Sequence, residues 1–597
     1  MLKTLKNQKI WVILALIFIL GTYLRVYHFN DWLHFELDQS RDAKVIDLAI
    51  QEGADNLPLL GPKAAGSFLR LGPIFYYFEY LSALVFGDTP SGMVAIACYF
   101  SCFTILVLFF LLRKYFEKNL SLLLTGLFSA SLFFIMYSRF GWNPNNLPFF
   151  ILLSFLALLN LSDPESKRKG IWLLVLSLAL GITTQLHFTA FLAIPAVTAL
   201  FLIWKRPRIR WTWWLGALLI LLTLYSPVII NDIKTGGDNM KEFVRVFQKK
   251  TDSKKETHTF IEKAYKDITE NSLGHFLILT GEESFELPRL KQIPGGLDFI
   301  CDASCRKGIW GGGIGIAFFS LGAFLLLLKT FFALKNNRVS ENQKNFLVLS
   351  SLWFIITLGL FFPIAYDIAP RFWLIISGLP LIFLGLTLET LQNFIPSKRL
   401  GFWLILVLAS IFIFSNLWNV KKRFWQLENA PKVNFEIGPD RILKENTRVT
   451  LEQQYMIINH ILGIYAKNEF PIYLNSEAYY RRSLLYHLDK KEIPRDDFRN
   501  ASNSKKIYLE GNYFLIYPTS ANWESKTEKY MNDFDVIDKK DFGTLTLWQL
   551  APKDGVANAV RQEFEEKGKP KSAPGVPVRY RWEEIFDDQT GDEKEVE

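Results

Sequence analysis

The chain has 597 residues, of which 50% are hydrophobic and 15% aromatic. Its 67 Lys and Arg residues against 58 Asp and Glu residues give a formal net charge of +9. These values exclude a disordered chain, a disulfide-rich secreted module and a collagen-like repeat. The basic residues form small groups between apolar runs instead of one patch, which indicates membrane topology and no nucleic-acid partner.

Apolar runs with the length of a membrane-crossing helix, about 20 residues, recur along the chain. In order they are 10–29, 92–112, 119–138, 146–162, 171–186, 189–204, 211–230, 311–333, 346–365, 371–392 and 401–419. We therefore predict a polytopic α-helical membrane protein with about 11 transmembrane helices. Residues 1–420 form this membrane part, with polar loops at 30–91 and 231–310.

Basic clusters fall at alternate ends of these runs. They are Lys3/Lys6/Lys9, Arg113/Lys114/Lys118, Lys167/Arg168/Lys169, Lys205/Arg206/Arg208/Arg210, Lys335/Arg338/Lys344 and Lys398/Arg399. Because an excess of Lys and Arg marks cytoplasmic loops, we expect a cell-membrane protein with a cytoplasmic N-terminus. Both polar loops and everything after residue 420 then lie outside, and one basic cluster, 421–423, is on the opposite side from the rest.

The outer loops contain a short apolar segment and a pair of cysteines. Residues 74–86 are apolar but short and contain Glu79, so we expect a helix along the outer leaflet and not a crossing. Cys301 and Cys305 lie in the second loop, where they either form a disulfide or stay free. The rest of the loop 231–310 is charged and is expected to be a solvated surface, part of which could act as a lid.

The part after residue 420 alternates helical and strand patterns. Residues 448–467 and 476–488 are predicted helices, and 471–475, 506–510, 513–518 and 544–550 are predicted strands. We predict a small extracytoplasmic α/β domain at 421–551, followed by a flexible polar tail at 552–597. This domain has no Gly-rich phosphate loop and no Ser/His/Asp order, so we expect it to support a site elsewhere.

The first outer loop contains the most informative motif, LDQSRDA at 37–43. Asp38 precedes a helical pattern in which Ala43, Ile46 and Ile50 share a face, so it lies at or near a helix N-terminus. The helix dipole favours a carboxylate there. One interpretation is a helix cap within a surface ion-pair network. The other is a base that acts on an acceptor hydroxyl beside a phosphate held by arginines.

Polar side chains also mark three other outer span ends. They are Arg139, Trp142 and Asn143 in YSRFGWNPNN, Gln185 and His187 in GITTQLHFTA, and Asp367 and Arg371 in YDIAPRFW. A lone His187 is more commonly a packing residue, and Asn143 before Pro144 is most simply a turn and cap. Polar groups that gather on one side of a membrane nevertheless favour a functional site.

With these motifs, the chain resembles the GT-C glycosyltransferases, specifically the branch of protein O-mannosyltransferases and lipid A aminoarabinose transferases. LDQSRDA is similar to the family's acidic segment after the first span, and the likeness continues through LGPIFYY (71–77) and the WNP turn (142–144). It covers about residues 10–420.

The resemblance implies an inverting transfer of a sugar from a polyprenyl-phosphate donor to a lipid, glycan or protein acceptor at the outer membrane face. By position, Asp38 would be the general base, and Arg41, Arg70 and Arg371 are candidates for holding the lipid phosphate. The other substrate-binding candidates are Asp42, Tyr76, Tyr77, Arg139, Asn143, Gln185 and His187.

Two departures from the family leave a divalent metal open. Gln39 stands where relatives often have Glu, and Asn143 where they often have Asp, so hard cations would find fewer charged oxygen ligands. The alternative function is a transporter or lipid flippase. That class should show charged residues in mid-span and broken helices related by repeats, and the sequence has few of the former and no evident repeat.

Overall fold

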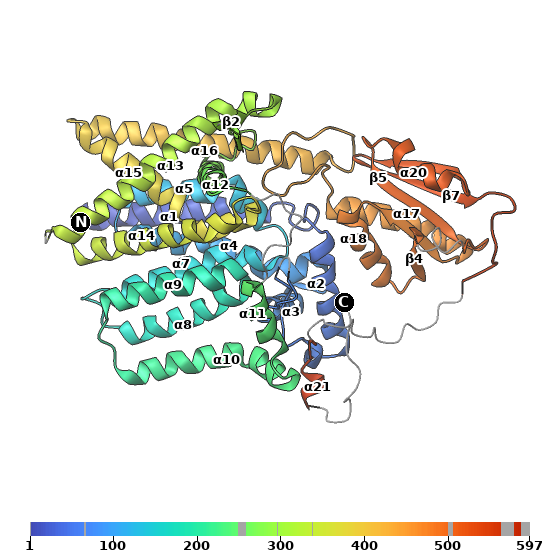
Figure 1. Cartoon of the computed structure of the whole chain (residues 1–597), viewed down its shortest axis with the longest axis horizontal. Helices are drawn as coiled ribbons and strands as arrows, with labels where there is room; N and C mark the ends of the chain where they lie inside the picture. Colours follow the sequence, from blue (N-terminus) through green and yellow to red (C-terminus); the bar gives the residue numbers. More distant parts are fainter. Residues whose placement is uncertain are drawn as a thin grey trace.

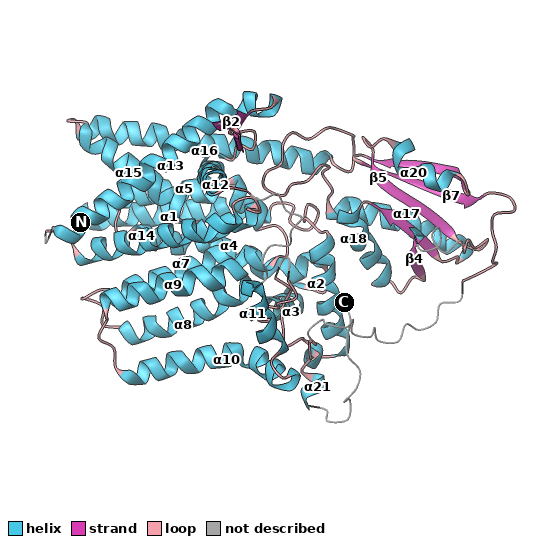
Figure 2. Cartoon of the chain, viewed as in Figure 1, coloured by secondary structure: helices cyan, strands magenta, loops and turns pink. Residues whose placement is uncertain are grey.

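The computed structural model describes residues 2–64, 67–248, 258–294, 296–336, 338–499, 506–562 and 578–586. In Figure 1 a bundle of long helices forms one part of the molecule, and a smaller domain lies beyond one end of the bundle. Figure 2 shows that the long strands belong to this smaller domain. The N-terminus lies at the opposite end of the bundle (Figure 1).

Among the described residues, 9 helices are long and apolar enough to cross a membrane, or 10 if one bent pair counts as a single span. The helices are α1 (Leu2–Val26), α4 (Pro90–Leu112), α7 (Leu147–Ser162, preceded by the 3-10 turn Asn143–Asn146), α8 (Lys169–Leu186), α9 (Phe188–Lys205), α10 (Trp211–Thr235), α13 (Ala303–Lys335), α14 (Glu341–Phe361) and α16 (Lys398–Asn429). The bent pair is Pro370–Ile376 with α15 (Leu379–Phe394), at 57°. The chain is a multi-pass membrane protein.

The burial of these helices follows their place in the bundle. Helix α7 is central, with 83% of its apolar window buried inside the protein, whereas only 11% of the window of α10 is buried. Trp211 and Ile233 on α10 are 72% and 75% exposed. Large apolar side chains left uncovered along a whole helix are stable facing lipid, where water does not penalise them.

The predicted span at 119–138 is divided into α5 (Lys118–Ala130) and α6 (Leu132–Tyr137), so the count by length falls below 11. Ser131 at the break is extended, with φ −62° and ψ 119°. A neighbouring helix supplies a substitute partner, because Asn416 Oδ1 accepts from the Leu132 amide at 2.9 Å. The Ser131 hydroxyl donates to the carbonyl of Ile278 on another helix. Such internal substitutes let a helix break within a membrane.

Contacts bring several of the predicted cytoplasmic basic clusters together at one end of the bundle. Lys114 lies 3.5 Å from Asp163, which also accepts a hydrogen bond from Asn342. Lys205 Nζ lies 2.5 Å and Lys344 Nζ 3.6 Å from carboxylate oxygens of Glu341. The loops after α4, α7, α9 and α13 therefore share one side, as their charges predicted.

The basic cluster at 421–423 has a different role from the others. Arg423 is 3% exposed and pairs with Glu283 at 2.8 Å and Asp440 at 3.4 Å. Burial on the carboxylates of other segments explains why a basic residue occurs on the side where the charge pattern did not expect one.

The described residues of the loop 231–310 contain helices and a hairpin, and part of them is buried, which its charge did not suggest. It contains α11 (Asp238–Gln248), α12 (Phe260–Thr280) and the antiparallel hairpin β1 (Arg289–Ile293) and β2 (Gly296–Ile300). The second half of α12 is buried, and Gly274 leaves no room for a Cβ beside Trp373. Cys301 and Cys305 form a disulfide at the start of α13.

Two helices of the first outer loop lie at the end of the bundle near the smaller domain (Figure 1). They are α2 (Leu37–Glu52) and α3 (Ile74–Phe86), joined by a loop with the 3-10 turn Ala54–Asn56. The helix predicted at 74–86 is confirmed.

The smaller domain is α/β, as predicted. Its elements are α17 (Leu451–Asn468), β3 (Ile472–Ser476), α18 (Ala478–Asp489), β4 (Arg495–Asp497), β5 (Asn512–Pro518), α20 (Trp523–Met531), β6 (Phe534–Phe542) and β7 (Leu545–Pro552). The strand order is β4-β3-β5-β7-β6, with β3 parallel to both its neighbours and β7 antiparallel to both of its own. Alternate side chains of the central strands enter two separate apolar clusters, one on each face of the sheet.

Three features of the C-terminal part differ from the sequence-based expectation. The predicted strand at 506–510 is not formed, and only Tyr508 makes an isolated bridge, to Ala559. Strands β4 and β6 were not predicted, because β4 has three residues and β6 carries charged, exposed side chains. The expected domain boundary at 420 falls inside α16.

The tail after residue 552 also differs from the expected flexible segment. The described residues 578–586, which include α21 (Glu583–Phe586), are hydrogen-bonded to the first outer loop. The other parts of the predicted tail, 563–577 and 587–597, lie outside the described residues.

Candidate active site

Asp38 is the second residue of α2, directly outside the first membrane helix. Glu36 caps this helix through a reciprocal capping box with Gln39, whose Oε1 accepts from the Glu36 amide at 3.0 Å. Asp38 is therefore not the cap itself, and its carboxylate stands in the first turn, where the helix dipole is positive. The side chain is 41% exposed and accepts a hydrogen bond from Arg41 Nη1 at 3.0 Å.

Asp42 lies one turn further along α2 and is buried, with its side chain 1% exposed. Arg41 holds it with two hydrogen bonds, Nε to Oδ1 at 2.9 Å and Nη2 to Oδ2 at 3.0 Å. Tyr76 on α3 donates to the same carboxylate at 3.0 Å. Burial raises the pKa of Asp42 to about 6, although Arg41 favours the charged form.

Arg41 thus joins two carboxylates, one exposed and one buried. It pairs with Asp38 on the solvent side and with Asp42 on the protein side. This arrangement places Asp42 as an anchor that orients the guanidinium and leaves Asp38 accessible to a substrate.

Arg371, far away in the sequence, comes close to this cluster. Its guanidinium carbon lies 5.2 Å from the ring centre of Trp142 and 5.1 Å from that of Phe372. It lies close enough to Asp38 for the two charges to interact. The structure therefore brings together two of the predicted outer span ends with the first outer loop.

His187 and Asn143 have structural contacts in this arrangement. His187 caps α9, accepting from the Thr189 amide at 3.3 Å, and its ring packs edge-on against Phe372 with 5.4 Å between ring centres. Burial and the nearby Arg371 lower the pKa of His187 to about 3, so the ring is neutral at pH 7. Asn143 donates to the carbonyl of Leu186 and so joins the two loops.

Gln185 fixes the start of α3. Its Oε1 accepts from the Ile74 amide at 3.4 Å, and its Nε2 donates to the carbonyl of Leu224 at 2.9 Å. A Cβ on Gly72 would come within 2.1 Å of Gln185 Oε1. The glycine in the LGP motif is therefore required by this close approach.

Arg70 lies at a largely apolar cavity of about 500 Å³ between the first outer loop and helices α8 to α11. Its backbone pairs with the side chain of Asn239, and its Nη1 donates to the carbonyl of Gly61 at 3.3 Å. The walls include Phe188, Phe191 and Ile229. The charged side chains in the lining are Arg70 and Asp232.

Arg139 and Tyr77 do not take part in the Asp38 cluster. The guanidinium of Arg139 is buried and donates to the carbonyls of Arg25 at 2.9 Å and His28 at 3.1 Å, so it closes the outer end of α1. Tyr77 donates to the carbonyl of Pro58 at 3.2 Å and accepts from Trp582 Nε1 at 2.9 Å.

A buried cluster next to Asp38 was not predicted from the sequence. His34 Nδ1 lies 2.8 Å from Glu445 and its Nε2 lies 3.6 Å from Glu36. Burial alone would lower the pKa of His34, but the two carboxylates outweigh it and raise the pKa to about 9. No pattern could link His34 to Glu445, because they lie in different domains and meet only after folding.

Within the described residues, His34, Glu36 and Glu445 form the group that could hold a metal ion. Their possible ligand atoms all lie within 4.8 Å of one another. One imidazole and two carboxylates form a plausible donor set. The raised pKa of His34 indicates that both ring nitrogens carry protons at pH 7. Without a metal the cluster is an ion pair between the two domains, and a metal bound by His34 would displace a ring proton.

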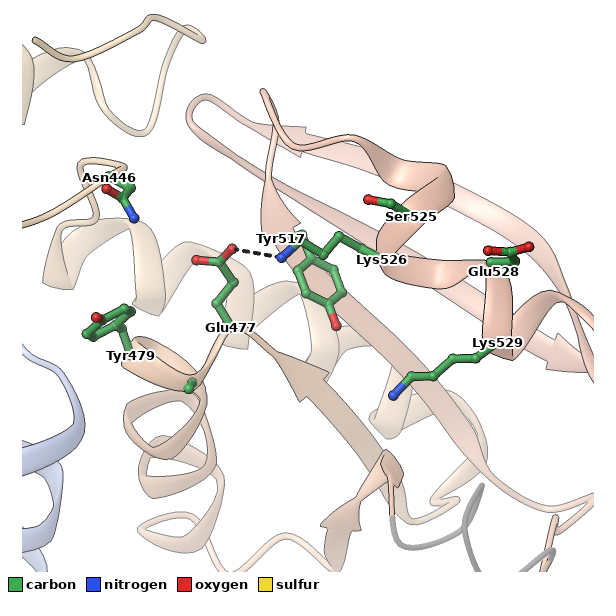
Figure 3. Close-up of a pocket in the computed structure, with 9 residues that line it drawn as sticks. Asn446, Glu477, Tyr479, Tyr517, Ser525, Lys526, Glu528 and Lys529 are labelled. Carbon is green, nitrogen blue, oxygen red and sulfur yellow. Dashed lines mark ion pairs between the residues drawn. The ribbon is translucent and has the colours of Figure 1, made fainter. Parts of the chain in front are cut away.

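A second open pocket, of about 580 Å³, lies in the C-terminal domain, and Figure 3 shows its polar lining. Glu477 lies 3.9 Å from Lys526, and Tyr517 lies beside them in the figure. All of its lining residues come from 446–529, so it is separate from the Asp38 cluster in sequence.

Comparison with known proteins places these observations in a family context. Residues 71–230 match the family model described as dolichyl-phosphate-mannose-protein mannosyltransferase. The chain resembles the GT-C glycosyltransferases that use polyprenyl-phosphate sugars. A search of curated proteins found no match. The matched segment begins at Leu71, directly after Arg70. It contains both tyrosines of LGPIFYY and the loops with Asn143 and His187.

Two solved structures are similar in overall shape. ArnT from Cupriavidus metallidurans, bound to undecaprenyl phosphate, is 10% identical, with 93% of this chain and 99% of that chain covered and a TM-score of 0.49. The oligosaccharyltransferase AglB from Archaeoglobus fulgidus, in complex with an inhibitory peptide and a dolichol-phosphate, is 13% identical. The match covers 88% of this chain and 70% of that one, with a TM-score of 0.47.

Proposed function

We propose that this protein is an integral membrane glycosyltransferase that moves a sugar from a polyprenyl-phosphate donor to an acceptor at the outer face of the cell membrane, with inversion and with Asp38 as the general base. The observation that carries the proposal is the position of Asp38. It is an accessible carboxylate at a helix N-terminus directly outside a membrane span, paired with Arg41 and near Arg371.

The chemistry needs few groups from the protein. The isoprenoid tail would stay in lipid or in the apolar cavity at Arg70, while its phosphate and sugar lie at the boundary. A phosphate neutralised by guanidinium groups is a good leaving group. Asp38 would take the proton of the acceptor hydroxyl as that oxygen attacks the anomeric carbon from the side opposite the phosphate, which inverts the configuration.

The orientation in the membrane is part of the proposal. Contacts of Lys114, Lys205 and Lys344 bring their loops together at one end of the bundle. Helix α2, which carries Asp38, and the α/β domain lie towards the other end (Figure 1). The positive-inside rule puts the basic end in the cytoplasm, so the site and the α/β domain face outward.

The test is Asp38→Asn in full-length protein reconstituted in liposomes with a radiolabelled polyprenyl-phosphate sugar. Loss of a general base lowers the rate by about 10²- to 10⁴-fold, and we expect this loss with normal membrane insertion. Asp31→Asn is the matched control, because Asp31 is another carboxylate of the same loop, 48% exposed, paired with His28. Transfer by Asp38→Asn at the rate of Asp31→Asn would overturn the assignment. Movement of the lipid across the bilayer without transfer would favour the flippase alternative.

A further inference from the structure

The end of the chain returns to the candidate site. After β7 the described chain continues to residue 562, and the segment 578–586, here called the C-terminal strap, then lies near α3 and α10, away from the sheet (Figure 1). Its contacts are with the first outer loop and α10, so residues from the two ends of the sequence meet at the outer face of the bundle.

Backbone hydrogen bonds hold the strap against residues 57–59. The Leu59 amide donates to the carbonyl of Tyr580 at 2.9 Å, and the Trp582 amide donates to the carbonyl of Leu57 at 3.3 Å. These bonds flank an antiparallel pair of Pro58 with Arg581. The strap thus binds as an added short strand, a mode in which main-chain bonds supply affinity.

Side chains fix the register of this pairing. Trp582 Nε1 donates to the hydroxyl of Tyr77 at 2.9 Å, and Arg581 Nη1 donates to Asn56 Oδ1 at 3.0 Å. Tyr77 in turn donates to the carbonyl of Pro58, so the tyrosine of the LGPIFYY motif connects α3, the loop and the strap.

Asn231 at the outer end of α10 is the strongest sign that the strap belongs there. Its side chain is fully buried. Its Nδ2 donates to the carbonyl of Val578 at 3.2 Å, and its Oδ1 accepts from the Tyr580 amide at 2.9 Å. Without the strap, both the Nδ2 donor and the Oδ1 acceptor of Asn231 would lose these hydrogen bonds. The loss of a hydrogen bond destabilises a protein more when the group left without a partner is buried than when it is exposed.

This docking puts Arg579 beside the ring of Tyr76, which binds Asp42. Arg579 is 8% exposed, and its guanidinium carbon lies 5.9 Å from the ring centre of Tyr76, whose hydroxyl donates to Asp42. The local charge makes this cation important. Asp38 and Asp42 share Arg41 between them, and Arg371 is the other cation near Asp38, so a phosphate approaching α2 meets two carboxylates and two guanidinium groups before Arg579 is counted.

We propose that Arg579, delivered by the C-terminal strap, is a binding residue for the phosphate of the lipid donor. The proposal rests on the proposed function. Arg579 adds a third guanidinium to Arg41 and Arg371, so that cations outnumber the pair Asp38 and Asp42, and its donors form a planar fork, the geometry that suits phosphate oxygens. The strap is then part of the site and not a plug over it.

The docking itself is tested first, without any substrate. Pro58 and Arg581 face each other in the pair that exchanges no hydrogen bonds, where Cα atoms lie about 4.5 Å apart, within the range a disulfide spans. The double variant Pro58→Cys/Arg581→Cys in full-length protein should crosslink on mild oxidation, and Pro58→Cys with Arg561→Cys should not. Equal crosslinking of both pairs, or none, would overturn the docked strap.

Arg579 is tested by binding of a polyprenyl monophosphate of defined length to the full-length protein, followed by native mass spectrometry. Arg579→Ala should weaken binding about tenfold, Arg579→Lys should recover part of it, and the exposed Arg561→Ala should have no effect. In transfer assays Arg579→Ala should raise the KM for the donor more than it lowers kcat. Unchanged binding overturns the proposal, and so does tighter binding or faster transfer, the result expected of an inhibitory plug.

These outcomes separate the two proposals. If the unaltered protein neither binds the lipid phosphate nor transfers sugar, the proposed function fails, while the crosslink still reports the docking. If the unaltered protein is active and Asp38→Asn is not, but Arg579→Ala binds the donor normally, only the role of Arg579 fails.

Discussion

Arg41→Ala tests whether Asp42 is an anchored, buried charge. The substitution removes two hydrogen bonds, at 2.9 and 3.0 Å, from a carboxylate that is 1% exposed, and leaves it with Tyr76 alone. Breaking a buried ion pair by removing one partner costs about 3–5 kcal/mol. We expect a loss of this size in the free energy of unfolding of the full-length protein at pH 8.

The loss should depend on pH with a definite sign. Burial raises the pKa of Asp42 to about 6 in the folded protein, above the ordinary value of 3.8 for an aspartate. Because Arg41 favours the ionised form, its removal raises this pKa further. In the variant the penalty is complete only above this raised pKa. It shrinks as the pH falls from that value towards 6, and it is constant below 6, where Asp42 is protonated with or without Arg41.

Urea unfolding in mixed micelles at pH 8 and pH 5 measures both effects. Arg41→Ala/Asp42→Asn should recover much of the loss at pH 8, because it removes the unpaired charge. Lys44→Ala is the control, since Lys44 forms a half-exposed pair with Asp489 worth roughly 0–1 kcal/mol. A cost for Arg41→Ala no larger than that of Lys44→Ala, or the same cost at both pH values, would refute the reasoning.

Two further substitutions probe the surroundings of the site. The pKa of His34 is raised from 6.5 to about 9 by its pairing with Glu36 and Glu445. This pairing therefore stabilises the protein fully below pH 6.5, by about 3 kcal/mol at most. The stabilisation is lost as the pH rises through 9. His34→Gln should therefore be destabilising at pH 6 and nearly neutral at pH 10 in thermal unfolding, and a pH-independent difference would contradict this. Gly72→Ala forces a Cβ against Gln185 and should lower the free energy of unfolding by about 1–3 kcal/mol. Gly313→Ala is the control and should lower it far less, because a Cβ there meets open space. Equal losses for the two variants would argue against the close approach at Gly72.

The sequence by itself determined the membrane architecture and the local start of the site. Hydropathy identified the crossing helices because a chain in lipid must satisfy its backbone hydrogen bonds within each helix. The motif at 37–43 predicted a helix start at Asp38, since capping depends on neighbouring residues. The strands β3, β5 and β7 were predictable because their apolar side chains are buried.

Only the tertiary structure decided which distant groups meet. The predicted span breaks at Ser131, where Asn416 on another helix supplies a hydrogen bond to the Leu132 amide and the Ser131 hydroxyl bonds the carbonyl of Ile278. Arg371 reaches the neighbourhood of Asp38, and His34 pairs with Glu445, through the packing of whole helices. The strap carries Arg579 to Tyr76 from the far end of the chain. Contacts of this kind depend on where folded elements dock, and no spacing between residues records that.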